Sequence, residues 1–327
     1  MGRPIVLDEG SLHEAFLPEK PLYRETHVNE ILECLGPIKH GKSARNVYVY
    51  GMSGTGKTTT VRSILSNHFR DMSVYVNCWN NKTTHKIMEE ILSQMGIIVH
   101  GWESTNVLIK IFEKAKRKVI VCLDESDHLK DKDLLYTFAR SGCPVILISN
   151  HSYSPHKLDG RIKSSLHLQE IEFRTYQAEE IRDILRERIN TGLTPQSIAD
   201  EMIAEIANSC GGDARAGIQI LKNAAVSSES KGLESITIDE IKAAASCARK
   251  YRLSYLIGKL NEHQKSIYEI LRQNRVMDSG SLFNEYRKVV NGTITDRSYR
   301  NYMLRMVELG LVREIGASRW KKYEIAV

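Results

Sequence analysis

The 327-residue sequence predicts an α/β domain built on a parallel sheet, followed by a small helical domain and a C-terminal winged helix-turn-helix. In the first half of the chain, compact apolar runs alternate with helix-length segments, as in a sheet covered by helices on both faces. In the second half, helical periodicity replaces the strand signal. At roughly 150 residues per domain, the length fits two or three domains. We expect a tail over 1–16, a base domain over 17–174, a helical domain over 175–250 and the winged helix over 251–327.

Five β-rich runs predict the strands of the sheet, at 46–50, 73–78, 118–123, 144–149 and 166–173. Beyond them, apolar stripes through 181–189 and 198–206 predict helices. We expect the second of these helices to begin at Thr194 and Pro195, a capping residue followed by proline at the first helical position. Thr237 and Glu240 have the spacing of a capping box and predict a further helix.

Three amphipathic segments, at about 262–273, 280–290 and 296–309, precede Gly310, a residue suited to end a helix. The runs LVREI and WKKYEIAV then alternate in polarity on either side of GASR, as the two strands of a hairpin do. Three helices and a hairpin form a winged helix-turn-helix.

Composition excludes several classes of protein. Charged residues make up 26% and hydrophobic residues 42% of the chain, and the mean hydropathy is -0.33, as in globular rather than disordered or membrane proteins. No apolar run is long enough to span a bilayer, and the N-terminus lacks the basic and apolar regions of a signal peptide. We therefore expect a cytoplasmic protein without a membrane partner. The cysteines and histidines are scattered, so we expect reduced core thiols and no structural metal site.

The net charge of +6 is concentrated at the C-terminus. Residues 250–327 contain 15 Lys and Arg against 8 Asp and Glu, a net charge of +7, whereas the preceding 249 residues have a net charge of -1. A cationic segment of this kind favours a polyanionic partner such as nucleic acid, although the same residues can form a merely solvated surface.

A glycine-rich sequence from Gly51 to Thr58, GMSGTGKT, matches the phosphate-binding loop G-x-x-x-x-G-K-[ST]. It lies where that loop requires, between a predicted strand and a helical run. Glycines let backbone N–H groups converge on the β-phosphate, Lys57 supplies a positive charge to the β and γ oxygens, and the Thr58 hydroxyl ligates Mg²⁺. The candidate ligands of ATP or ADP in this region are Gly51, Ser53, Gly54, Thr55, Gly56, Lys57, Thr58 and Thr59.

Two carboxylates follow the apolar run VIVCL, downstream of the loop. Asp124 would hold the metal ion, and Glu125 would polarise the attacking water. Asn150 ends the next strand, where its amide would either orient that water or form a turn. Arg161 and Arg215 are further candidates for the site, although either could be an ordinary surface arginine. Arg215 opens a predicted helix with its side chain away from the apolar face, free to face another domain.

Taken in order, the motifs resemble the AAA+ ATPases, and more narrowly the archaeal replication initiators related to the origin recognition complex and the cell division control loader proteins. The matching segments are LPEKPLYRE, YGMSGTGKTTTV, VCLDESDHL, LISN, LDGRIKSSL, GGDAR and DRSYRNYMLRMVELGLV, which together span nearly the whole chain. The resemblance implies an AAA+ base, a helical lid and a DNA-binding winged helix. It also implies a slow ATPase, associated with the nucleoid, whose partners are double-stranded origin DNA, the MCM helicase and other initiator subunits.

The resemblance assigns further roles to residues of this sequence. Tyr23 and Arg24 would line the adenine pocket, Asn150 would act as sensor 1 and Arg215 as sensor 2. Arg161 lies in the segment that supplies an arginine finger to a neighbouring subunit. Residues from about 80 to 117 take the place of the helical insertion with which initiators grip DNA, and the candidate contacts there are Lys82, Lys86 and Lys110.

In a winged helix, the third helix usually enters the major groove, and the wing contacts the backbone or the minor groove. If Met303, Met306 and Val307 face the core, the opposite face of this helix is exposed. Arginine and asparagine can pair bidentately with guanine and adenine edges. Trp320, in the wing, either packs within the hairpin or stacks on a base. The candidate DNA contacts are Arg297, Arg300 and Asn301 on the helix, and Arg319, Lys321 and Lys322 in the wing.

Two other functions fit parts of this sequence. A signalling NTPase would use the same loop, lid and winged helix for autoinhibition or oligomerisation without binding DNA, but it has no need of a cationic C-terminal segment. A DNA-binding regulator would keep ADP as a structural ligand and turn over negligible ATP. Of the three, we expect the replication initiator.

Overall fold

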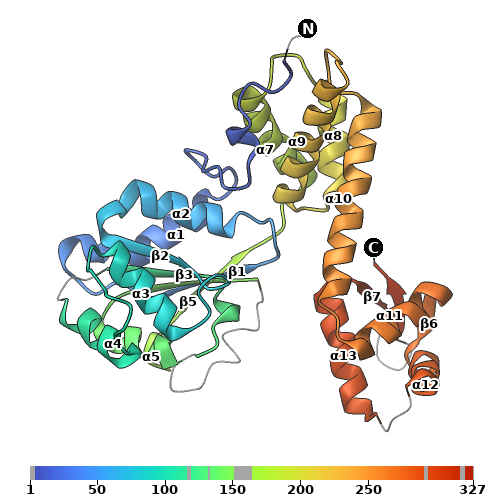
Figure 1. Cartoon of the computed structure of the whole chain (residues 1–327). Coiled ribbons are helices and arrows are strands. Elements are labelled where there is room, and N and C mark those ends of the chain that lie inside the picture. The colour runs from blue at the N-terminus through green and yellow to red at the C-terminus, as the bar shows by residue number, and fades with distance from the viewer. Residues whose placement is uncertain are drawn as a thin grey trace. The chain divides into compact units, whose positions relative to one another are not determined.

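The computed structural model describes residues 4–115, 119–131, 133–150, 164–290, 294–316 and 321–326 (Figure 1). The chain divides into two compact units, Met1–Ile241 and Lys242–Val327. The division lies within helix α10 (Ile238–Gly258), which also contains the boundary expected at residue 250. The first unit therefore holds both the base and the helical lid.

The first unit is built on a sheet of five parallel strands, which confirms the strands expected from the sequence. The strand order is β2-β3-β4-β1-β5. Because all strands run parallel, their carboxyl ends share one edge, and the loops that follow β1, β3 and β4 meet there. The strands are β1 (Val47–Gly51), β2 (Ser73–Asn77), β3 (Ile120–Asp124), β4 (Val145–Ser149) and β5 (Gln169–Phe173).

Helices cover both faces of this sheet (Figure 1). Along β3, Ile120 and Cys122 pack with α1 and α2, whereas Val121 and Leu123 pack with α3, α4 and α5. This alternation is that of a strand buried on both sides. The helices are α1 (Glu25–Leu35), α2 (Lys57–His68), α3 (Thr84–Gln94), α4 (Thr105–Lys114) and α5 (Asp133–Ser141), with short 3₁₀ helices at Gly10–Leu12, Gly36–His40, Arg70–Met72 and Ser126–His128.

A helical lid follows β5. Its helices are α7 (Ala178–Gly192), α8 (Asp200–Ser209), α9 (Ala214–Ser230) and the first part of α10. The expected start of α8 at Thr194 is wrong, because the helix begins at Asp200 with Ala199 as its N-cap. Thr194 is engaged elsewhere: its hydroxyl donates to the carbonyl of Pro4 at 2.5 Å and its N–H to that of Ile5 at 2.9 Å. A tertiary contact here takes precedence over a local capping signal.

The N-terminal segment packs against the lid, whereas the sequence predicts a separate tail. Val6 pairs with Leu193 in an isolated antiparallel bridge, and the side chains of Ile5 and Leu12 are buried. Burying an aliphatic side chain of this size contributes roughly 1.5 to 3 kcal/mol. Ile5 and Leu12 therefore belong to the core of the first unit.

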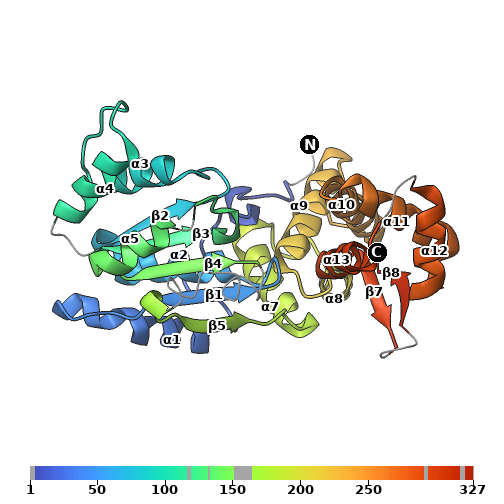
Figure 2. The same ribbon diagram turned by 90° about the horizontal axis from the view of Figure 1, so that it is seen from below.

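After the rest of α10, the described residues of the second unit form three further helices and an antiparallel sheet of order β6-β8-β7 (Figure 2). The helices and the strands β7 and β8 are those expected from the sequence. Strand β6 is not predicted, because a run of only three residues shows no alternation. The apolar faces meet in one core around Tyr286, Met303 and Met306. The elements are α11 (Glu262–Asn274), β6 (Val276–Asp278), α12 (Ser279–Val289), α13 (Asp296–Glu308), β7 (Val312–Ile315) and β8 (Lys322–Ile325).

The cysteines are free thiols, and all are buried as expected except Cys247, which is exposed. Within the described ranges, no group of three or more His, Cys, Asp and Glu side chains is arranged to hold a metal ion. None of the helices in the described part of the chain combines the length and the apolar character that crossing a membrane requires.

Candidate nucleotide-binding site

A cavity lies at the carboxyl edge of the sheet, between the base and the lid. The cavity thus brings together residues that the sequence places far apart. The predicted site residues that line it are Ser53, Gly54, Thr55, Gly56, Lys57, Thr58, Thr59, Asp124, Glu125, Asn150 and Arg215.

The glycine-rich loop is packed so closely that a side chain is excluded at Gly54 and at Gly56. Gly54 and Gly56 have φ angles of +72° and +82°, in the left-handed region that glycine tolerates. A Cβ at Gly54 would lie 1.8 Å from a carboxylate oxygen of Asp213, and one at Gly56 would lie 2.5 Å from the hydroxyl of Tyr176. Gly51 likewise has a positive φ and no room for a Cβ, but it does not line the cavity.

Lys57 begins α2, and its side chain is buried. The ammonium group donates to the backbone carbonyls of Gly51 at 3.0 Å and Met52 at 2.6 Å. Burial lowers the pKa of this amine to about 8, even though the charge of nearby Asp124 opposes the shift. Backbone dipoles thus solvate a cation beside the cavity, where an anionic ligand would be a stronger partner.

Asp124 ends β3 and accepts hydrogen bonds from three directions. One carboxylate oxygen accepts from the Thr58 hydroxyl at 2.8 Å and from the Tyr75 hydroxyl at 2.6 Å, and the other accepts from the N–H of Glu125 at 2.8 Å. Burial, followed by the charge of Asp124, raises the pKa of Tyr75 and keeps its hydroxyl a donor. The sequence gives no signal for Tyr75, which reaches Asp124 from the neighbouring strand β2.

The predicted base and its neighbour reach the same cavity. Glu125 follows β3 with a φ of +51°, an uncommon conformation for a residue with a side chain. Burial, and then the negative charge of Asp124, raise the pKa of the Glu125 carboxyl. A carboxylate with a raised pKa is a better proton acceptor near neutral pH. Asn150 lines the cavity after β4, so these two side chains can act on the same water.

The two candidate arginines differ in what the structure shows of them. Arg215 lines the cavity near the N-terminus of α9. Its side chain lies 3.5 Å from the carboxylate of Glu14, and both side chains are more than half exposed, so the pair contributes little to stability. The Arg215 guanidinium is therefore available to a ligand. Arg161 lies outside the described residues.

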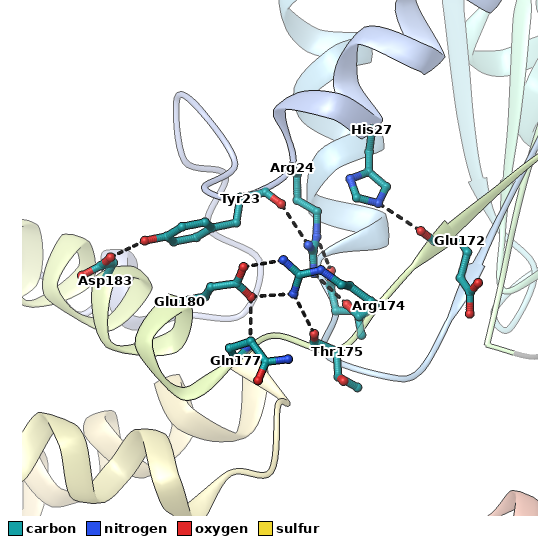
Figure 3. Close-up of polar contacts among 10 residues, drawn as sticks. Tyr23, Arg24, His27, Glu172, Arg174, Thr175, Gln177, Glu180 and Asp183 are labelled. Carbon is teal, nitrogen blue, oxygen red and sulfur yellow. Dashed lines mark hydrogen bonds and ion pairs between the residues drawn. The ribbon is translucent and has the colours of Figure 1, made fainter.

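Tyr23 and Arg24 are not among the residues that line this cavity, and their expected place in an adenine pocket stays a prediction. Figure 3 shows their polar contacts. The Tyr23 hydroxyl donates to Asp183 of α7, and the Arg24 side chain is fully buried. The residues of the segment LPEKPLYRE that line the cavity are Pro18, Pro21 and Leu22.

The start of α7 depends on an ion pair between Arg174 and Glu180, whose carboxylate also accepts from the N–H of Gln177 at 2.8 Å. The hydrogen bond from Arg174 lowers the pKa of Glu180. The pair therefore stabilises the fold above the ordinary pKa of a glutamate, and this contribution is lost as the pH falls through the lowered pKa. We expect Glu180→Gln to lower the free energy of unfolding by about 1 kcal/mol at neutral pH, with a smaller loss in acid.

Thermal unfolding of the original protein and of Glu180→Gln, from neutral to acidic pH, measures how the loss of stability depends on pH. An equal loss at all pH values would contradict it, because a packing defect does not titrate.

The structure exposes the candidate DNA contacts that it describes. Arg297, Arg300 and Asn301 lie on the outer face of α13, whereas Met303 and Met306 are buried. Arg300 pairs with Asp296 on the same helix and Lys321 pairs with Glu314, while Lys322 is exposed. Lys82, Lys86 and Lys110 are exposed around α3 and α4, away from the cavity lining. Arg319 and Trp320 lie outside the described residues.

Known proteins share this fold. The AAA domain family matches residues 39–158, and the Cdc6 AAA+ ATPase-type lid domain family matches residues 182–246. The structure of the Aeropyrum pernix ORC1 protein in complex with DNA is similar to this chain, with a TM-score of 0.73 and 24% identity, covering 100% of this chain and 94% of that one. The Aeropyrum pernix ORC2 protein in ADPNP and ADP complexes has a TM-score of 0.79 and 19% identity, covering 98% of this chain and 94% of that one.

The similarity extends to the sequence. ORC1-type DNA replication protein 9 of Halobacterium salinarum is 27% identical to this chain, covering 98% of it and 94% of the relative. ORC1-type DNA replication protein 1 of Sulfolobus acidocaldarius is 31% identical, covering 94% of this chain and 86% of the relative. The resemblance inferred from the motifs is thereby confirmed. The chain belongs to the family of ORC1-type DNA replication proteins, with the AAA domain and the Cdc6-type lid of an AAA+ ATPase.

Proposed function

We propose that this protein is an ATP-dependent initiator of DNA replication, which binds duplex DNA at an origin and helps to recruit the MCM helicase. The observation that carries the proposal is the presence, in one chain, of a cavity lined by the glycine-rich loop and Asp124, and of a helix, α13, on which Arg297, Arg300 and Asn301 are exposed. Slow ATP hydrolysis acts as a switch that controls DNA binding or helicase recruitment. The protein works at the nucleoid in the cytoplasm, together with other initiator subunits.

The ligand of the cavity is ATP or ADP, with Mg²⁺ held by Thr58 and Asp124. One hydroxyl and one carboxylate are few ligands, which suits Mg²⁺, because this ion keeps waters and phosphate oxygens in its coordination sphere. When bound, it neutralises charge on the phosphates. Glu125 accepts a proton from the attacking water, which Asn150 orients. Lys57 and Arg215 balance the phosphate charge, and Arg161 acts on the nucleotide of a neighbouring subunit.

The duplex binds the exposed face of α13 and the wing. The start of this helix is fixed by Thr295, whose hydroxyl accepts from the N–H of Ser298 at 3.2 Å. Arginine and asparagine side chains on the first turns can therefore be presented to base edges from a rigid element. The second unit, residues 242–327, contains 17 Lys and Arg against 8 Asp and Glu, a net charge of +9. A polyanion is the partner that this charge fits.

We expect Arg297→Ala to weaken binding to a preferred duplex by about 5- to 150-fold, because a bidentate contact to a base contributes about 1 to 3 kcal/mol. Fluorescence anisotropy at one fixed salt concentration measures the change. Arg272→Ala is the matched control, since Arg272 is also an exposed arginine of the second unit but pairs with Glu269 on α11. Equal losses for the two variants would mean that α13 does not read bases.

Nucleotide-dependent DNA binding tests the whole proposal. DNA footprints with ATP, with ADP and without nucleotide should differ, and log affinity should fall linearly with log salt by about 0.9 per phosphate neutralised. In cells, immunoprecipitation should enrich one or a few intergenic loci. Identical footprints with ATP, with ADP and without nucleotide would contradict the proposed control of DNA binding by the nucleotide. A flat salt response would remove the DNA assignment and favour the signalling NTPase.

A further inference from the structure

Arg24 joins three separate parts of the first unit. Its guanidinium donates to the carbonyls of Thr55 at 3.0 Å, Tyr23 at 2.9 Å and Arg174 at 2.9 Å (Figure 3). The side chain has no exposed surface, and burying a cation is unfavourable unless its donors are satisfied. Here each of the three guanidinium nitrogens donates to a backbone carbonyl. The position of each carbonyl is therefore tied to that of the other two.

The bond to Thr55 orients a peptide group of the phosphate-binding loop. The carbonyl of Thr55 and the N–H of Gly56 belong to the same peptide plane, and in a trans peptide they point in opposite directions. No peptide bond in the described part of the chain is cis. Because the carbonyl points to the buried guanidinium, the Gly56 N–H points away from it. Gly56 lines the cavity, where such N–H groups bind phosphate oxygens.

The Arg24 guanidinium also contacts the linker between β5 and α7. The Arg24 guanidinium carbon lies 3.8 Å from the centroid of the Tyr176 ring, and its Nη2 donates to Arg174 in the same linker. The Tyr176 ring also contacts the loop, since its hydroxyl lies 2.5 Å from the position of a Cβ on Gly56. Arg24 and Tyr176 therefore couple the linker to the phosphate-binding loop at two neighbouring points.

The linker is in turn fixed to the lid. The side chain of Arg174, whose carbonyl Arg24 holds, pairs with Glu180 in the first turn of α7. From the lid side, the N–H of Ala214 in α9 donates to the carbonyl of Gly54 at 3.1 Å. The carbonyl oxygens of two consecutive peptide groups of the loop thus accept hydrogen bonds, one from Arg24 and one from the lid itself. A movement of α7 relative to the base displaces the linker carbonyl that Arg24 holds.

We infer that Arg24 is a positioning residue for nucleotide phosphates. It orients the Gly56 N–H toward the cavity, and this orientation depends on the position of the lid. Arg24 has no place in the cavity lining, so it acts through the loop and not on the nucleotide. The inference rests on the nucleotide site alone. A chain that binds ADP but fails to bind DNA would contradict the proposed function and leave this inference standing.

The test compares ADP and AMP binding to the full chain by isothermal titration calorimetry with Mg²⁺ present. Arg24→Met removes every donor and should lower ADP affinity by roughly 10- to 100-fold, the effect of losing one well-aligned hydrogen bond to a charged group. AMP lacks the β-phosphate that the loop amides bind, so its affinity should fall much less. Arg24→Lys keeps the charge with a single donor group and should give an intermediate loss.

Asp183→Ala is the control, because it removes the neighbouring contact between Tyr23 and α7 and leaves the bonds of Arg24 in place. Its ADP affinity should stay within about twofold of the original. Thermal unfolding without nucleotide shows whether each variant is folded, and if Arg24→Met is not, Arg24→Lys decides. A larger loss for ADP than for AMP supports the inference. Equal losses for both nucleotides, or an unchanged ADP affinity in Arg24→Lys, would overturn it.

Discussion

Glu125→Gln is expected to lower ATP turnover by about 100- to 10,000-fold, the usual contribution of general-base catalysis, while ATP affinity changes little. The Glu125 carboxyl lines the cavity beside Asp124, and burial together with that neighbouring charge raises its pKa. An amide of the same shape occupies the same space but cannot take a proton from water. Phosphate release at saturating ATP measures turnover, and equilibrium binding measures affinity.

Asp127→Asn is the matched control for this substitution. Asp127 follows the same strand and pairs with His128, but its side chain does not line the cavity. Turnover in this variant should remain within about twofold, because the amide keeps the shape of a side chain that lies outside the cavity lining. Undiminished hydrolysis in Glu125→Gln would show that another group accepts the proton.

Gly54→Ala is expected to weaken ADP binding by roughly 10- to 100-fold, since overpacking costs about 1 to 3 kcal/mol. The new Cβ would lie 1.8 Å from the carboxylate oxygen of Asp213, the N-cap of α9. Asp213 cannot move aside without releasing the N–H of Ala216, which its carboxylate accepts at 3.0 Å. The clash therefore displaces the start of α9, and with it Arg215, from the loop. Calorimetric titration with ADP measures the loss.

Gly41→Ala separates this clash from backbone strain. Gly41 has a φ of +69°, close to that of Gly54, and nothing lies within 4 Å of a Cβ added there. Both alanines would share the cost of a left-handed conformation, about 1 kcal/mol. Gly41→Ala should lower the melting temperature and leave ADP affinity unchanged. If the two variants bind ADP equally well, the contact between α9 and the loop does not position the site.

The parts of the site whose residues lie close together in the chain are predictable from sequence. The loop GMSGTGKT is such a part, because its glycines, Lys57 and Thr58 act through adjacent backbone and side-chain groups. Asp124 and Glu125 are found by the same reasoning, since parallel strands bring their carboxyl ends to one edge. Helical periodicity likewise predicts which face of α13 is exposed, and the burial of Met303 and Met306 confirms it.

Contacts between distant segments are not predictable in this way. Tyr75 donates to Asp124 from 49 residues earlier, and nothing in the run SVYVN distinguishes it from any other strand tyrosine. The partners of Arg24 lie up to 150 residues away, so its burial follows from the complete fold. Thr194 shows the same limit, since a local capping signal gives way to a hydrogen bond with Pro4, 190 residues away.

The packing of residues 4–16 on the lid also bears on how this protein is dissected for experiments. A fragment that starts at residue 17, at the edge of the base as the sequence suggests, would lose the Ile5 and Leu12 side chains that are buried in the whole chain. It would also lose Glu14 from the wall of the nucleotide cavity. Such a fragment should aggregate more readily, and a purification tag is better attached at the opposite end of the chain.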